Sequence, residues 1–146
     1  MSLNPLGEVK YRLKLASEHL ERAERAFTLN DWVAVVSSAQ LAVENFAKAV
    51  IAVFEVPTWS HDPSSQLLRL LSKAPSHLSS RLAELATLAS EVAPEHGRAA
   101  YGEPSRGLTP ADIYRKEHAA DMLSKARRAK ALAEEVLSGL GAIHGK

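Results

Sequence analysis

The sequence predicts an all-α fold, an antiparallel up-down bundle of four to five helices. Apolar residues recur at spacings of three and four along most of the chain, which places them on one face of a helix. Asparagine or aspartate next to proline or an apolar run marks several typical helix starts. No segment alternates apolar and polar residues for long enough to indicate a strand.

The first two helices are predicted to form a hairpin. One apolar stripe runs from Leu6 to Phe27 behind an Asn4 cap, and a second runs from Trp32 to Val53 behind an Asp31 cap. About two residues separate the helices, so they must run antiparallel. Additional apolar residues flank the second stripe, and we expect this helix to be the most buried one.

The rest of the chain is predicted to hold two shorter helices, a loop and a long closing helix. The first of the shorter helices follows Pro63, and the second spans about 77–92. Residues 95–108 contain three glycines and a proline without periodicity, which indicates the longest irregular loop. The closing helix starts at Thr109 and runs to about Leu140.

Composition narrows the class of protein. The 146 residues carry 18 basic and 17 acidic side chains, a formal charge of +1, so no strong field points to nucleic acid or membrane. There is no cysteine, no apolar run long enough to cross a bilayer and no signal-peptide core near the first residue. We expect one domain over residues 1–146, cytoplasmic and without a membrane partner.

No motif predicts a catalytic centre, a metal site or a cofactor. Phosphate loops, dinucleotide-binding glycine motifs and the zinc-protease motif are absent. None of the six histidines has a glutamate three residues before it, which argues against a di-iron bundle. His118 and Asp121 share a helix face, but two ligands alone make a weak metal site.

A polar ridge interrupts the second helix. Gln40, Glu44 and Lys48 are four residues apart and therefore share one face beside the apolar stripe. The simpler interpretation is an edge that reaches solvent or pairs with the last helix; the alternative is a role in ligand binding.

The string Ala39-Gln40-Leu41-Ala42-Val43-Glu44-Asn45-Phe46-Ala47-Lys48-Ala49-Val50 resembles the signature helix of the HEPN family, Gln-x-Ala-x-Glu-x-x-x-Lys-Ala. Further segments extend the resemblance over nearly the whole chain: residues 16–23, the Asn30-Asp31-Trp32 turn, the histidine-led helix of residues 61–71, residues 101–103 and residues 114–119. The resemblance implies an antiparallel helical bundle, usually a homodimer, that binds or acts on nucleotides or RNA. Such proteins often act with a separately encoded minimal nucleotidyltransferase, in a toxin–antitoxin pair or as its substrate-binding partner.

The ribonuclease members of that family carry an Arg-x4-6-His motif, and this chain departs from it. The pair with such a spacing, Arg12 and His19, falls in the first helix, whereas the resemblance places the motif at the start of a later one. Arg115 and His118 are too close together in the sequence. We therefore expect a non-catalytic module; the alternative is a ribonuclease toxin in which Arg98 or Arg115 acts with His118.

The predicted nucleotide-binding residues combine the ridge with the residue 95–108 loop. Tyrosine can stack on a base and arginine can hold phosphate. The opposing interpretation of Tyr101 is an aromatic plug at the end of the bundle. The candidates are Gln40, Glu44, Lys48, His61, Arg98, Tyr101 and Arg106.

Two features of the last helix allow further interpretations. The basic residues Lys125, Arg127, Arg128 and Lys130 are flanked by acidic ones, which favours a solvated face over an RNA-binding one. The small residues Ala126, Ala129 and Ala133 suggest a third function, a structural partner that buries this face against a second copy.

Overall fold

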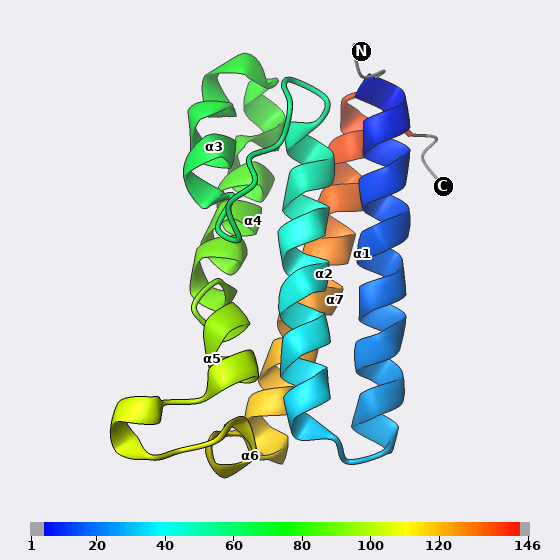
Figure 1. The fold of residues 1–146 in the computed structure, drawn as a ribbon. Helices are drawn as coiled ribbons and strands as arrows, with labels where there is room; N and C mark the ends of the chain where they lie inside the picture. Colours follow the sequence, from blue (N-terminus) through cyan, green and yellow to red (C-terminus); the bar gives the residue numbers. More distant parts are fainter. Residues whose placement is uncertain (1–4, 144–146) are drawn as a thin grey trace.

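The computed structural model describes residues 5–143, and this part of the chain is helical, with one isolated β-bridge between Glu103 and Leu108. The all-α bundle is therefore confirmed. Asn4, the predicted first cap, lies outside the described residues. Four longer helices form the body of the bundle (Figure 1). They are α1 (Pro5–Thr28), α2 (Trp32–Ile51), α4 (Ser79–Val92) and α7 (Lys116–Gly139). The shorter elements are α3 (Ser64–Arg69), η1 (Leu71–Lys73), η2 (Ser76–Leu78), α5 (Glu95–Tyr101), η3 (Pro104–Arg106) and α6 (Pro110–Ile113).

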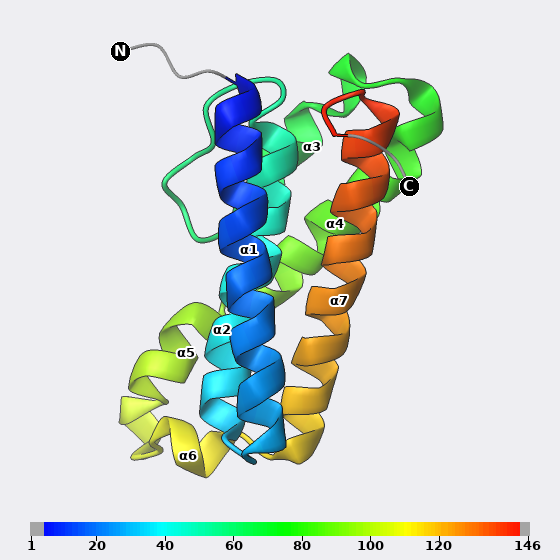
Figure 2. The same cartoon turned by 90° about the vertical axis from the view of Figure 1, so that its right-hand side faces the viewer.

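The predicted α1–α2 hairpin is present, and local chemistry explains its turn. Asn30 has a φ of 59°, a left-handed conformation that asparagine tolerates better than most residues. Asp31 then caps α2 by accepting a hydrogen bond from the Ala34 backbone N–H at 3.3 Å. The two helices consequently pack side by side along their length (Figure 1), and in the view of Figure 2 α1 lies in front of α2.

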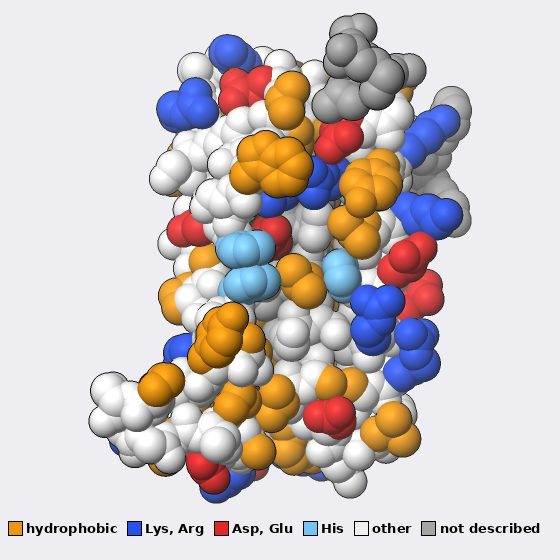
Figure 3. Space-filling view, in the orientation of Figure 1, with side chains coloured by type: hydrophobic (Ala, Val, Ile, Leu, Met, Phe, Trp, Pro, Cys, Tyr) orange, Lys and Arg blue, Asp and Glu red, His pale blue; other side chains and the backbone are white. Residues whose placement is uncertain are grey.

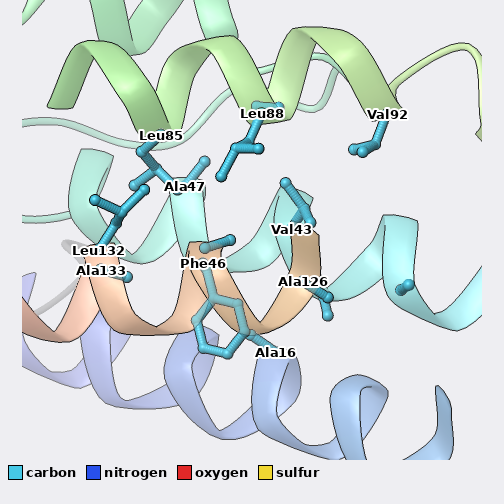
Figure 4. Packing of buried hydrophobic residues seen from close by; sticks show 14 of the residues in the cluster. Ala16, Val43, Phe46, Ala47, Leu85, Leu88, Val92, Ala126, Leu132 and Ala133 are labelled. Carbon is cyan, nitrogen blue, oxygen red and sulfur yellow. The ribbon is translucent and has the colours of Figure 1, made fainter. Parts of the chain in front are cut away.

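Helix α2 is the central helix of the bundle. It packs against α1, α7, α5 and α4, and most of its side chains are buried. Phe46 points from α2 towards Ala16 of α1, while Leu85 of α4 faces Ala47 on the opposite side (Figure 4). Because neighbours cover α2 on nearly every side, its polar residues are also enclosed by the fold.

The small residues of the last helix belong to this core. Ala126, Ala129 and Ala133 are fully buried within one chain. The prediction that they form a face for a second copy is therefore wrong, because their close packing serves α2 and its neighbours. The basic residues of α7 do lie at the surface, where Arg127 pairs with Glu24 and Arg128 with Glu84.

Two element boundaries differ from the prediction. Residues 95–101 form α5 and not an irregular loop, and the backbone turns away at Gly102, whose φ is 68°. The closing helix is also broken: Tyr114 and Arg115 are extended between α6 and α7. The buried Tyr114 side chain anchors this break, which spacing alone does not reveal.

Among the described residues, no helix combines the length and apolarity that a membrane-spanning segment needs.

Candidate functional site

The polar ridge of α2 is buried and fully bonded. Gln40 Nε2 donates to Glu44 Oε1 at 3.1 Å, and Lys48 Nζ donates to Glu44 Oε2 at 3.0 Å. The Glu44 and Lys48 side chains are only 6% and 5% exposed. The expectation that this ridge reaches solvent or pairs with α7 is wrong, because segments between α2 and α6 cover it.

Two histidines from separate segments cover the ridge. His61 lies between α2 and α3, with Nδ1 3.1 Å from Glu44 Oε1. His96 lies on α5, with Nδ1 3.0 Å from Gln40 Oε1. The two rings stack with centroids 3.6 Å apart and an interplanar angle of 19°. We call Gln40, Glu44, Lys48, His61 and His96 the histidine–glutamate cluster.

Local structure positions the two backbone segments that carry the histidines. Asp62, the residue after His61, accepts a hydrogen bond through Oδ1 from the backbone N–H of Ser64, the first residue of α3, at 3.0 Å, and this fixes the end of the His61 segment. His96 sits in the first turn of α5 and is half-buried. His61 is more open, with 55% of its side chain exposed. In Figure 3, histidine side chains gather at mid-height on one face, with hydrophobic groups above and below them.

The cluster stabilises a charged Glu44. Burial raises the pKa of this carboxyl. Hydrogen bonds from Gln40, Lys48 and His61 together lower the pKa by more than burial raises it, so the net shift of the Glu44 pKa is downward. The ionised carboxylate can only accept, so the His61 ring N–H donates to it. Gln40, whose amide donates to Glu44, must then accept from His96. The five side chains therefore form one connected network.

Arg12 and His19 of α1 lie beside α2. Arg12 Nη1 donates to Asn45 Oδ1 at 3.0 Å, and Arg12 Nε pairs with Glu8 at 2.9 Å. Burial and the charge of Arg22 lower the pKa of His19, while the charge of Glu44 opposes this shift. The charge of Glu44 therefore acts on His19 across the α1–α2 contact. The Arg12 guanidinium, by contrast, has a structural role, because it links α1 to Asn45 of α2.

The remaining predicted residues form a second network on α5 and η3. Arg98 pairs with Glu95 at 2.6 Å and with Glu103 at 3.1 Å, and Arg106 pairs with Glu103 at 2.8 Å. Carboxylates therefore already hold both guanidinium groups that were expected to bind phosphate. Among the described residues, Arg98 Nε is the one buried side-chain polar atom without a hydrogen bond. Tyr101 is 77% exposed.

Tyr101 does not plug the bundle, so that interpretation is wrong. The buried tyrosine is Tyr114, whose hydroxyl donates to Glu95 Oε2 at 3.3 Å. Burial and the nearby Glu95 carboxylate raise the Tyr114 pKa, and the Arg98 charge only partly opposes them. The hydroxyl of Tyr114 therefore stays protonated and serves as a donor.

His118 has a local role that the sequence did not reveal. Its Nδ1 accepts the backbone N–H of Arg115 at 3.1 Å and so caps the first turn of α7. The Arg115 guanidinium bonds the Ala111 carbonyl at 3.2 Å. Asp121, the other candidate metal ligand, pairs with Lys125. Within residues 5–143, His118 therefore has no carboxylate or guanidinium partner with which to act in chemistry.

Four predicted residues thus meet in one place: Gln40, Glu44, Lys48 and His61. The structure adds His96, which sequence analysis missed because its segment was expected to be an irregular loop. The Gln-x-x-x-Glu-x-x-x-Lys spacing was the one sequence pattern that predicted a polar site. No spacing indicated that His96 of α5 belongs to it.

Comparison with known proteins agrees with this fold. A sequence model of the HEPN domain matches residues 9–137, which is most of the chain. No curated protein and no solved structure matches. The helical bundle and the extent of the match together show that the chain belongs to the HEPN domain family.

Proposed function

We propose that this chain binds a nucleotide or RNA at the histidine–glutamate cluster and does not itself catalyse a reaction. The observation that carries the proposal is the pair of stacked, partly open imidazoles held over the buried Gln40–Glu44–Lys48 row. Because Nδ1 of each ring is bonded within the cluster, Nε2 is the nitrogen left for a ligand: it accepts from a base N–H in the neutral ring and donates to a phosphate oxygen in the protonated ring. The buried row binds one nitrogen of each ring and so positions the histidines for a ligand.

Exposed aromatic side chains flank the cluster in the sequence. Trp59 precedes His61 by two residues and is 95% exposed, and Tyr101 ends the helix that carries His96. Aromatic rings in open positions can stack on bases without sequence preference. They supply the contact with a base, while the histidines supply polar contacts.

The engaged arginines support a binding function over a nuclease one. Metal-independent RNA cleavage needs a cation that stabilises the developing phosphorane charge. Arg98 is held by Glu95 and Glu103, and Arg12 is held by Glu8 and Asn45. A phosphate would have to displace these carboxylates before either guanidinium could act.

The proposed cellular setting rests on family membership. The partner we propose is a separately encoded minimal nucleotidyltransferase, in a toxin–antitoxin pair or as its substrate-binding subunit, in the cytoplasm. We also propose a homodimer, through a surface other than the alanines of α7. Copurification of the chain with the product of a neighbouring nucleotidyltransferase gene tests the partner, and light scattering tests the dimer.

Tryptophan fluorescence and calorimetry test the binding function. In a Trp32→Phe background, Trp59 reports on ligand directly, and AMP, ATP and a short single-stranded RNA are titrated. Tyr101→Ala should weaken binding by about tenfold, since one stacked base contributes about 1–3 kcal/mol. His61→Ala should also weaken it by about tenfold, because it removes a hydrogen bond to the ligand. His77→Ala, an exposed histidine of η2, is the matched control. Absence of binding for all three ligands by a folded protein refutes the proposal.

The alternative is a ribonuclease centred on the same cluster. Two adjacent imidazoles and the ammonium of Lys48 are groups that exchange protons and stabilise anions. This alternative predicts cleavage of RNA in the presence of a chelator, lost in both His61→Ala and His96→Ala. His118→Ala should leave that cleavage unchanged, because His118 caps α7.

A further inference from the structure

We infer that Glu44, His61 and His96 form a binding site for a divalent transition metal such as Zn²⁺. This inference goes beyond nucleotide binding. The three residues come from α2, the α2–α3 segment and α5, so only the folded chain brings them together. One potential ligand atom of each residue lies within 4.8 Å of the other two.

The closest pair already has nearly the right separation. Two ligand atoms at about 2.0–2.1 Å from a tetrahedral Zn²⁺ lie about 3.3 Å apart. Glu44 Oε1 and His61 Nδ1 are 3.1 Å apart. A metal would replace the hydrogen bond between these two atoms. The neutral His61 imidazole would carry its proton on Nε2 as the other tautomer, so no net charge changes on the ring.

Neighbouring residues hold the ligands as the surroundings of metal sites usually do. Lys48 Nζ binds Glu44 Oε2 at 3.0 Å and leaves Oε1 directed to the histidines. Gln40 Oε1 accepts from His96 Nδ1 at 3.0 Å, and the neutral ring then has its lone pair on Nε2. Such outer hydrogen bonds fix the orientation of a ligand and its tautomer.

Metal binding requires one rearrangement. Stacked rings at 3.6 Å direct their in-plane lone pairs side by side, not towards a common point. One imidazole must therefore turn. His61 can do so because its side chain is 55% exposed and its segment, unlike α5, is not helical at that residue. The same exposure leaves at least one coordination position open to water or to a phosphate oxygen.

The donor set selects the class of metal. Two imidazoles and one carboxylate suit Zn²⁺, Co²⁺ or similar ions, whereas Mg²⁺ and Ca²⁺ prefer oxygen ligands only. The ammonium of Lys48 already neutralises Glu44, so the cluster has little net negative charge with which to attract a hard cation. Imidazole coordination must supply the affinity.

Titration with Co²⁺ tests the site, using untagged protein of residues 1–146 after chelator treatment. We expect one Co²⁺ per chain, with the visible absorption bands of a low-coordinate N/O site, and displacement of Co²⁺ by Zn²⁺ but not by Mg²⁺. His61→Ala and His96→Ala should each lower the affinity at least about tenfold. His77→Ala should bind as the wild type does. Circular dichroism confirms that each variant is folded, and Glu44→Gln offers a third ligand variant.

Absence of stoichiometric Co²⁺ binding, or equal affinity in wild type, His61→Ala and His96→Ala, overturns the inference. Its failure is distinguishable from failure of the proposed function. Nucleotide and RNA binding are measured in a chelator, and Co²⁺ binding is measured without nucleotide. If AMP or RNA binds in the presence of the chelator but Co²⁺ does not bind in the separate titration, the proposed function stands and the metal site is refuted.

Discussion

The buried Glu44–Lys48 ion pair gives the most informative stability prediction. Lys48→Met keeps the length and apolar stem of the side chain but removes the ammonium. Glu44 would then be a buried carboxylate with two of its three side-chain partners, Gln40 and His61. Breaking one partner of a buried pair typically costs about 3–5 kcal/mol.

The structure places the expected loss at the lower end of that range, about 3 kcal/mol, because two hydrogen bonds to Glu44 remain and the adjacent His61 is open to water. For a chain of this size, that loss lowers the midpoint of thermal unfolding by about 10 °C. Urea unfolding at neutral pH, followed by circular dichroism, measures the free energy directly.

Two further variants separate the buried charge from general damage. Glu44→Gln combined with Lys48→Met removes both charges, so the double variant should be more stable than Lys48→Met alone. Arg127→Met breaks an exposed pair with Glu24 and should cost less than about 1 kcal/mol. A loss below about 1 kcal/mol for Lys48→Met, or no recovery in the double variant, would refute the reasoning.

The remaining predictions concern pH, backbone and packing. Because the folded pKa of Glu44 is lowered from 4.5, this group stabilises the fold above about pH 5, and its contribution is lost as the pH falls through the folded pKa. Glu44→Gln should therefore flatten the acid side of stability measured by urea unfolding; an unchanged slope would contradict this sign. Gly102 and Gly107 both have a φ of 68°, but a Cβ on Gly102 would lie 2.1 Å from the Leu108 carbonyl oxygen, whereas that on Gly107 meets open space. Gly102→Ala should cost more than Gly107→Ala, for which about 1 kcal/mol is expected, and thermal unfolding would show the opposite order if the reasoning failed. Phe46→Ala should cost about 3–5 kcal/mol in urea unfolding, since the ring is fully buried; a loss near zero would mean that α2 is not the centre of the core.

Periodicity predicted the long helices because each buries one apolar face. It located the α1–α2 turn, where Asn30 and Asp31 have the residue types that the backbone requires. It failed between α4 and α7. The residue 95–101 segment is helical although it contains Gly97, and the closing helix breaks where Tyr114 is buried. In both places contacts with other elements outweigh local preference.

The order of residue types along the chain determined the helical class, the position of its central helix and the Gln40–Glu44–Lys48 row. Spacing along one helix is a local property, so it can be deduced without a partner. Whether that row meets solvent or other side chains depends on which segments cover α2, and only the tertiary structure decided this. Packing placed His61 and His96 over the row, across separations of 17 and 56 residues. Contacts between residues so far apart leave no periodic signal in the sequence, because they arise only when the core closes.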